Sequence, residues 1–115
     1  MSACEAGIIV CEDQARLKAD AIICATGASL PSWPAACGLG ISQDGFIEVD
    51  STLKSTSHDY VFAAGDSATI KGQTRPKSGV YAVRQGIPLA KNLIRQATNK
   101  RLVSYKPQTH ALALM

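Results

Sequence analysis

The stretch TSHDYVFAAGD, from Thr56 to Asp66, carries the pattern around which the chain is organised. Its apolar run, residues 61–64, contains no charge and ends abruptly at Gly65 and Asp66. A short uncharged run of this kind predicts a buried strand of a parallel sheet. Open α/β sheets bind ligands at the carboxyl ends of such strands, which makes Asp66 a candidate binding residue. The same carboxylate would equally serve as a helix N-cap in an ordinary turn, and the residues alone leave both interpretations open.

Three segments of the chain resemble one known family. Thr56, the run 61–64 and Gly65-Asp66 are spaced like the second flavin-binding motif of the pyridine nucleotide-disulfide oxidoreductases, and AIICATG, residues 21–27, resembles the ATG segment of that superfamily. RPKSGVYAVRQGIPLAKNL, residues 75–93, is most similar to the branch that contains type II NADH dehydrogenases and the oxidoreductases associated with selenide, water dikinase. Members of that branch are much longer, so the resemblance implies a C-terminal portion of such an enzyme.

The resemblance implies an α/β fold class, and within it part of the flavoprotein fold that has two dinucleotide-binding domains. Residues 1–28 would be the end of the NAD(P)H-binding domain, residues 29–104 the C-terminal part of the FAD-binding domain, and residues 105–115 the start of a truncated C-terminal region. No GxGxxG sequence occurs in the chain, and this family carries that phosphate-binding fingerprint in an earlier segment. The expected cofactors are therefore FAD at a partial site, and NAD(P)H in the complete enzyme.

The resemblance places flavin contacts in two separate segments. Thr26 and Gly27 would contact the flavin side, although a simple strand-end turn is the other interpretation of this pair. Asp66 would accept a hydrogen bond from a ribityl or ribose hydroxyl, and Gly65 would leave room for the pyrophosphate. The residues that perform the chemistry stay unassigned.

A helix predicted to begin at Ser78 supplies the other contacts. The first-turn N–H groups of a helix lack intrahelical acceptors and carry about half a positive charge. A reduced flavin carries negative charge at its pyrimidine end, so the amides of Ser78, Gly79 and Val80 are suited to face it. Lys77 would add a full charge beside them.

These features favour a portion of a flavin-dependent oxidoreductase that passes electrons from NAD(P)H through FAD to an unidentified acceptor. Two alternatives stay open. One is a non-catalytic folded fragment or dimerisation module without bound flavin. The other is a flavin-free nucleotide-binding domain that uses the Gly65-Asp66 turn and the following helix for a phosphate.

Composition excludes several other classes of function. The 115 residues carry a net charge of +3 without a long basic block, which argues against nucleic acid as a partner. No apolar run reaches the roughly 18 residues that a transmembrane helix needs, so we expect a cytoplasmic location, with peripheral membrane association left open. The four cysteines form no CxxC pair, and we expect no metal site. Whether Cys37 is redox-active is left open.

Apolar runs predict strands at 6–11 and 20–25, with a short strand at 15–17 between them. Pro31, Trp33 and Pro34 argue against a regular element directly after these strands. Residues 35–41 are expected to contain one helical turn that a glycine ends, and alternation at 46–50 predicts an edge strand. The loop 67–77 carries Lys71 and Arg75 as solvated charges, and residues 102–105 suggest a last strand.

The helix that starts at Ser78 has apolar residues at steps of three and four, which predicts one buried face and a kink near Gly86 and Pro88. The stripe consists of Val80, Val83, Ile87, Ala90 and Ile94. Covering this stripe needs a wider sheet than the chain can build. We therefore expect the isolated chain to bind FAD weakly or not at all and to form a homodimer or larger species.

Overall fold

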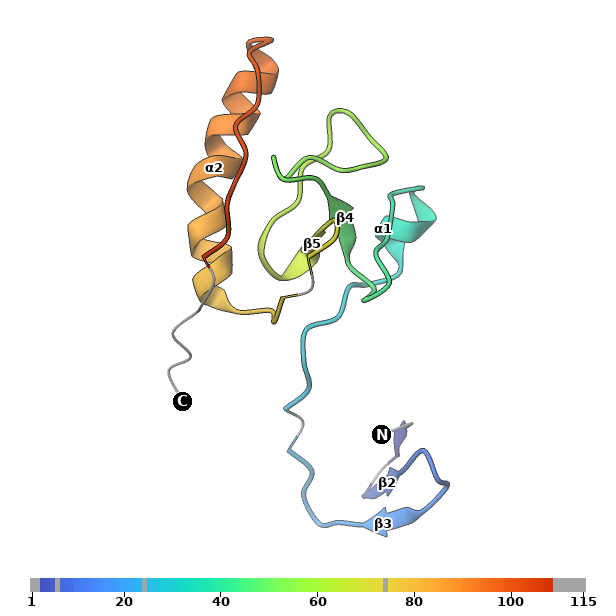
Figure 1. Cartoon of the computed structure of the whole chain (residues 1–115). Helices are drawn as coiled ribbons and strands as arrows, with labels where there is room; N and C mark the ends of the chain where they lie inside the picture. The colour runs from blue at the N-terminus through green and yellow to red at the C-terminus, as the bar shows by residue number, and fades with distance from the viewer. Residues whose placement is uncertain (1–2, 6, 24, 74, 109–115) are drawn as a thin grey trace.

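The computed structural model describes residues 3–5, 7–23, 25–73 and 75–108. The expectations for Cys24 and for residues 109–115 lie outside this part of the chain. The elements in order are β1 (Ala3–Glu5), β2 (Ile8–Val10), β3 (Arg16–Lys18), α1 (Trp33–Ala36), β4 (Ile47–Val49), the 3₁₀ turn η1 (Gly65–Ser67), β5 (Ala68–Ile70) and α2 (Gly79–Ala97). The chain combines helices with two small sheets, which agrees with a partial α/β dinucleotide-binding fold (Figure 1).

The N-terminal strands form an antiparallel sheet in the order β1-β2-β3, with Ile9 paired to Leu17. This confirms the strands expected within 6–11 and around 15–17. The expected strand at 20–25 is wrong for the described residues, because no segment lies beside them to supply ladder hydrogen bonds and Ile23 is 95% exposed. A long connection instead joins this sheet to the rest of the chain (Figure 1). The radius of gyration, 17.9 Å, exceeds the roughly 13 Å of a compact 100-residue domain.

The short helix α1 begins at Trp33, where the two prolines were expected to prevent any regular element. Pro34 lies in its first turn, where the missing N–H leaves no hydrogen bond unmade. The helix ends before Gly38, whose φ of +77° is the left-handed conformation that favours glycine. A single helical turn ended by a glycine is thus confirmed, a few residues earlier than predicted.

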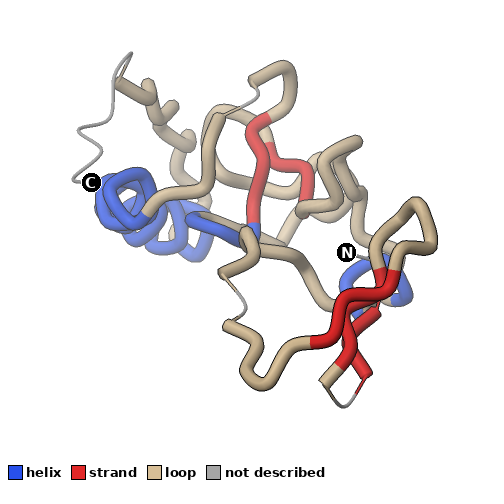
Figure 2. Tube along the Cα trace, turned by 90° about the horizontal axis from the view of Figure 1, so that it is seen from below, coloured by secondary structure: helices blue, strands red, loops and turns tan. Residues whose placement is uncertain are grey.

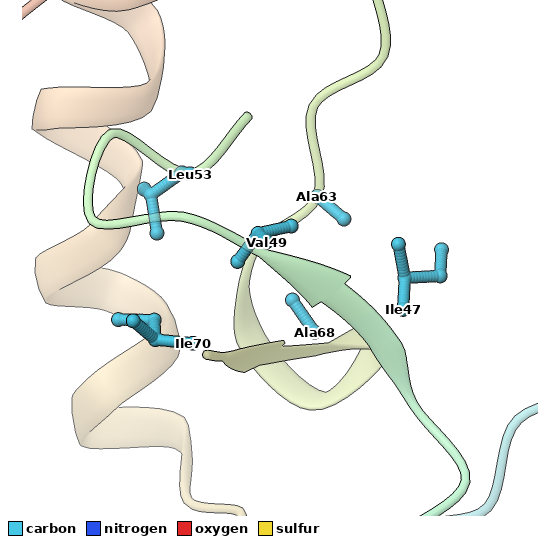
Figure 3. Packing of buried hydrophobic residues seen from close by; sticks show 6 residues of the cluster. All are labelled: Ile47, Val49, Leu53, Ala63, Ala68 and Ile70. Carbon is cyan, nitrogen blue, oxygen red and sulfur yellow. The ribbon is translucent and has the colours of Figure 1, made fainter. Parts of the chain in front are cut away.

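The core lies around the parallel pair β4 and β5, in which Ile47 pairs with Ala68 and Val49 with Ile70 (Figure 3). Six buried apolar side chains make up this cluster: Ile47, Val49, Leu53, Ala63, Ala68 and Ile70. The strand predicted at 46–50 is confirmed, but it is not an edge, since bridges to Ile41 and Ser55 pair it on its other side. The two sheets are separate when the chain is seen from below (Figure 2).

The apolar run 61–64 is extended but is not the predicted parallel strand. Phe62 makes only an isolated antiparallel bridge to Lys54, and the Ala63 amide donates to the Leu53 carbonyl over 3.1 Å. The parallel partner of β4 is β5, a three-residue strand inside the segment expected to be a loop. The run still contributes Ala63 to the core, so its apolar character reflects burial beside β4.

Helix α2 (Gly79–Ala97) begins one residue after Ser78, where a helix was predicted to start, and Ser78 is its N-cap. The helix continues through Pro88 to Ala97. The predicted buried stripe is wrong: Val83, Ile87 and Ile94 are 77%, 68% and 67% exposed. The buried positions of the helix are Tyr81, Gln85 and Asn92. Residues 102–105 run back along α2 without forming the expected strand (Figure 1). No helix within the described ranges has the length and apolar character needed to cross a bilayer.

Candidate functional site

A small hollow lies where η1, β5 and the N-terminal half of α2 meet. Gly65 and Asp66 line it from η1, and Tyr81 and Gln85 line it from α2. The loop between β5 and α2 contributes Gln73 and residues 75–78. Its volume is about 30 Å³. One water needs about 10–15 Å³ on this measure, so the hollow by itself admits only a few small groups. The hollow is therefore too small to hold a whole cofactor by itself, and its lining residues are called the wall.

The turn that carries Asp66 is built on a glycine in the left-handed conformation. Gly65 has φ +66°, and a Cβ at this position would meet the Ala82 Cβ at 3.0 Å. The Gly65 amide donates to the Gln85 side-chain oxygen over 2.6 Å. A close approach of the turn to α2 thus depends on glycine at position 65.

The Asp66 carboxylate is exposed and accepts no hydrogen bond within the described part of the chain. Asp66 stands inside the 3₁₀ turn, whose N-cap is Ala64. The interpretation of Asp66 as a helix N-cap is therefore wrong. Its two oxygens are available to a ligand at the edge of the hollow.

The first turn of α2 places Ser78 in the lining, but not Gly79 and Val80. The Ser78 hydroxyl accepts a hydrogen bond from the Val80 amide over 3.4 Å, so the cap already occupies one of the three predicted amides. The amides at the start of the helix still lack intrahelical acceptors. A Cβ on Gly79 would meet no atom within 4 Å, so this position is open to a neighbouring group.

Lys77 lines the hollow but is already bonded to the sheet. Its ammonium donates to the Ala68 carbonyl over 2.6 Å and to the Thr69 hydroxyl over 2.9 Å. It also lies 3.8 Å from the centroid of the Phe46 ring. Partial burial lowers the pKa of Lys77 below its ordinary 10.5, and the carboxylates of Asp44 and Asp66 oppose that shift. Its charge therefore acts from a fixed position beside Asp66.

Sequence reasoning missed two polar residues of the wall, Gln73 and Arg75. Arg75 was expected to be a solvated charge, but it is half-buried, donates to the Gln108 carbonyl over 2.8 Å and lies 5.8 Å from the Tyr81 ring centroid. The Arg75 Nε and the Gln73 Oε1 are buried without a partner in the described residues. Lys71, by contrast, is exposed as expected, and its Nζ lies 3.7 Å from the Glu48 Oε1.

The structure does not bring Thr26 and Gly27 to this wall. Both are exposed in the connection after β3, and neither lines the hollow. A Cβ on Gly27 would meet no atom within 4 Å. Their assignment to the flavin side remains a prediction from the motif.

Comparison with known proteins identifies the class. The sequence profile of the family described as pyridine nucleotide-disulphide oxidoreductase matches residues 3–86, which include both the N-terminal sheet and most of the wall. The chain belongs to this family of oxidoreductases.

The curated relatives that the chain resembles carry one name. It is 32% identical over 97 residues to ferroptosis suppressor protein 1 of Xenopus tropicalis, with 83% of this chain and 25% of the relative covered. It is 30% identical over 105 residues to the Xenopus laevis protein of that name, with 90% of this chain and 27% of the relative covered. The Taeniopygia guttata protein is 26% identical over 102 residues, with 87% and 26% covered. The chain thus spans about a quarter of the length of these relatives.

Proposed function

We propose that this chain supplies one wall of the FAD site of an oxidoreductase that passes electrons from NAD(P)H through FAD to an acceptor. The observation that carries the proposal is the meeting of Asp66 and the N-terminus of α2 at one hollow. The flavin contacts that the resemblance implies at Asp66 and at the start of α2 fall on these two elements, which β5 and the loop after it separate in the sequence. The small volume of the hollow supports a partial site.

The residues of the wall fit such a cofactor. Asp66 offers two free acceptor oxygens, and the buried Arg75 Nε and Gln73 Oε1 are a donor and an acceptor that the described chain leaves unmatched. A buried polar atom without a partner costs about 1–3 kcal/mol, which a polar ligand would recover. The wall therefore offers both donors and acceptors, and a ligand with hydroxyl, carbonyl and phosphate groups needs both.

Each group has a distinct task in this proposal. Asp66 accepts a hydrogen bond from a ribityl or ribose hydroxyl. The missing side chain of Gly65 lets this turn lie against Ala82 of α2, and room for the pyrophosphate at Gly65 stays a prediction of the motif. The open start of α2, at Ser78 and Gly79, and the fixed charge of Lys77 place positive potential where the isoalloxazine edge would lie. When bound, FAD would supply the hydride and electron transfer, and the described residues would bind and orient it.

The test compares Asp66→Ala with Asp59→Ala, a control in an exposed loop, within a full-length relative that carries this segment. We expect Asp66→Ala to lose bound FAD and retain its circular dichroism, whereas the control keeps a full complement of flavin. Stoichiometric flavin in purified Asp66→Ala protein would contradict the assignment.

One observation favours a second candidate function, that of a self-association module. Along α2, the exposed side chains of Val83, Ile87 and Ile94 form a continuous apolar face. An apolar surface of this kind gains free energy when a second copy covers it. In this proposal the isolated chain pairs through α2 and carries little or no flavin.

A further inference from the structure

A single hydrogen bond connects the two halves of the proposed wall. The Gly65 amide of η1 donates to the side-chain oxygen of Gln85, which stands twenty residues later on α2. Gln85 is 9% exposed, and its side chain also lines the hollow. Buried polar side chains are almost always hydrogen-bonded, and within the described residues this bond is the one that satisfies the Gln85 oxygen.

The bond acts together with a close steric contact. Ala82 and Gln85 are three residues apart on α2 and therefore share one face of the helix. Ala82 sits against the bare Cα of Gly65, where an added Cβ would come within 3.0 Å. The hydrogen bond holds the peptide between residues 64 and 65, which contains the Gly65 N–H, and the steric contact holds the Gly65 Cα against α2. Together they fix the start of the turn from which the next residue, Asp66, projects.

We infer that Gln85 is a positioning residue for ligand binding: its side-chain oxygen holds the Gly65 amide and so aims the Asp66 carboxylate at the hollow. The inference rests on the proposed function, because it assumes that the Asp66 carboxylate accepts a hydrogen bond from a hydroxyl of FAD. Gln85 acts through the Gly65 peptide and does not itself need to touch the cofactor. To accept the hydrogen bond from the Gly65 amide, residue 85 needs an oxygen at the end of a side chain of this length. Glutamine and glutamate both provide one.

Three variants of the 115-residue chain separate this role from simple packing. Gln85→Met keeps the length and helix preference of the side chain but removes the acceptor. Gln85→Glu keeps an acceptor oxygen at the same reach. Gln96→Met repeats the first substitution about three turns further along α2, where the side chain does not line the hollow. Amide hydrogen exchange of Gly65, read by NMR, reports the bond directly, and a titration with FAD reports its consequence.

We expect the Gly65 amide to exchange about tenfold faster in Gln85→Met than in wild type, and at the wild-type rate in Gln85→Glu and Gln96→Met. FAD affinity should weaken by about the same factor in Gln85→Met and stay unchanged in Gln96→Met. Unchanged Gly65 exchange in Gln85→Met would overturn the inference. So would faster exchange accompanied by wild-type FAD affinity, because the bond would then serve packing alone.

The two measurements also keep this inference separate from the proposed function. The exchange measurement needs no ligand, so it decides whether Gln85 holds the Gly65 peptide whatever the affinity for FAD. If the wild-type chain shows no FAD-induced shifts at Gly65 and Asp66, the affinity comparison moves to the full-length relative with the same substitutions. Loss of flavin there on Gln85→Met supports the inference, and full retention overturns it.

Discussion

Asn92 and Val103 are joined by two hydrogen bonds, in the manner of paired residues in a β-ladder. The Asn92 side chain donates to the Val103 carbonyl over 2.8 Å and accepts from the Val103 amide over 2.8 Å. The Asn92 Nδ2 also donates to the Thr52 carbonyl over 2.7 Å. One fully buried side chain of α2 therefore fixes both the returning segment 102–105 and the turn that precedes the apolar run.

Asn92→Leu should consequently destabilise the chain although it replaces a polar side chain with an apolar one of similar volume. Three backbone groups, two carbonyls and one amide, would lose their partner, at a net cost of about 2–4 kcal/mol. Urea unfolding followed by circular dichroism measures this cost. Lys91→Ala, on the neighbouring exposed position, is the control and should change stability by less than about 0.5 kcal/mol. A loss for Asn92→Leu no larger than the control's would show that water replaces the side chain.

Asn92 also illustrates what periodicity alone could not decide. The spacing of apolar residues correctly predicts a helix that starts at about Ser78. A 3.6-residue period identifies the side chains that share one face of a helix. Which face is buried depends on the segments that pack against the helix. In this chain Asn92 and Gln85 face inward because backbone groups of the turns need their amides, and Ile87 faces out.

Strand predictions failed for a related reason, because a strand exists only where a neighbour pairs with it. Residues 61–64 are as apolar as a central strand, yet β5 occupies the position beside β4. The motif residues Gly65 and Asp66 do line the hollow, and their contact with flavin stays a prediction. The contributions of Gln73, Arg75 and Gln85 carry no local signal beyond a polar residue type, and only the folded arrangement brings them together.

The outward face of α2 predicts self-association of the isolated chain. In sedimentation experiments with and without FAD, the wild-type chain should form a homodimer or larger species and carry little flavin. Ile87→Gln with Ile94→Gln should shift it toward monomer by removing apolar area at the contact. Because both side chains are largely exposed within one chain, the monomer should lose little stability.

Arg84→Gln is the matched control for this pair, since it changes an exposed residue of the same helix without removing apolar surface. It should leave the sedimentation profile unchanged. A wild-type chain that sediments as a monomer with tightly bound flavin would refute both the association and the reading of the wall as a partial site.

Asp44 should make the stability of the chain depend on acid pH. A hydrogen bond from the Ser42 hydroxyl is the main cause that lowers the pKa of Asp44 below its ordinary 3.8, while slight burial acts the other way and Thr69 and Lys77 assist. A lowered pKa means that the folded state binds the proton less readily than the unfolded state. The stabilisation is therefore complete above about pH 3.8 and is lost as the pH falls through the folded-state pKa.

Asp44→Asn should abolish this dependence of stability on pH. The variant should be less stable than wild type near neutral pH, and the difference in the free energy of unfolding should shrink as the pH falls below 3.8, the ordinary pKa of an aspartate. Because the carboxylate is mostly solvated, we expect a difference of no more than about 1 kcal/mol. Urea midpoints measured across this range provide the comparison. A constant difference at all pH values would assign the effect to packing and not to the charge.

Lys77 should tune the redox potential if the wall holds FAD as proposed. Its ammonium is held in place by Ala68 and Thr69 and lies over the Phe46 ring, so its charge stands at a fixed point on the lining of the hollow. In a full-length relative, Lys77→Glu should make flavin reduction harder and lower the potential by an amount on the order of 30 mV, equivalent to about 1.4 kcal/mol for a two-electron couple.

Lys77→Met, which removes the charge without reversing it, should give a smaller shift in the same direction. Spectroscopic titration against reference dyes measures both values, and Lys71→Glu, at an exposed position outside the hollow, is the control. Potentials that stay at the wild-type value in both Lys77 variants would mean that this charge does not face the flavin.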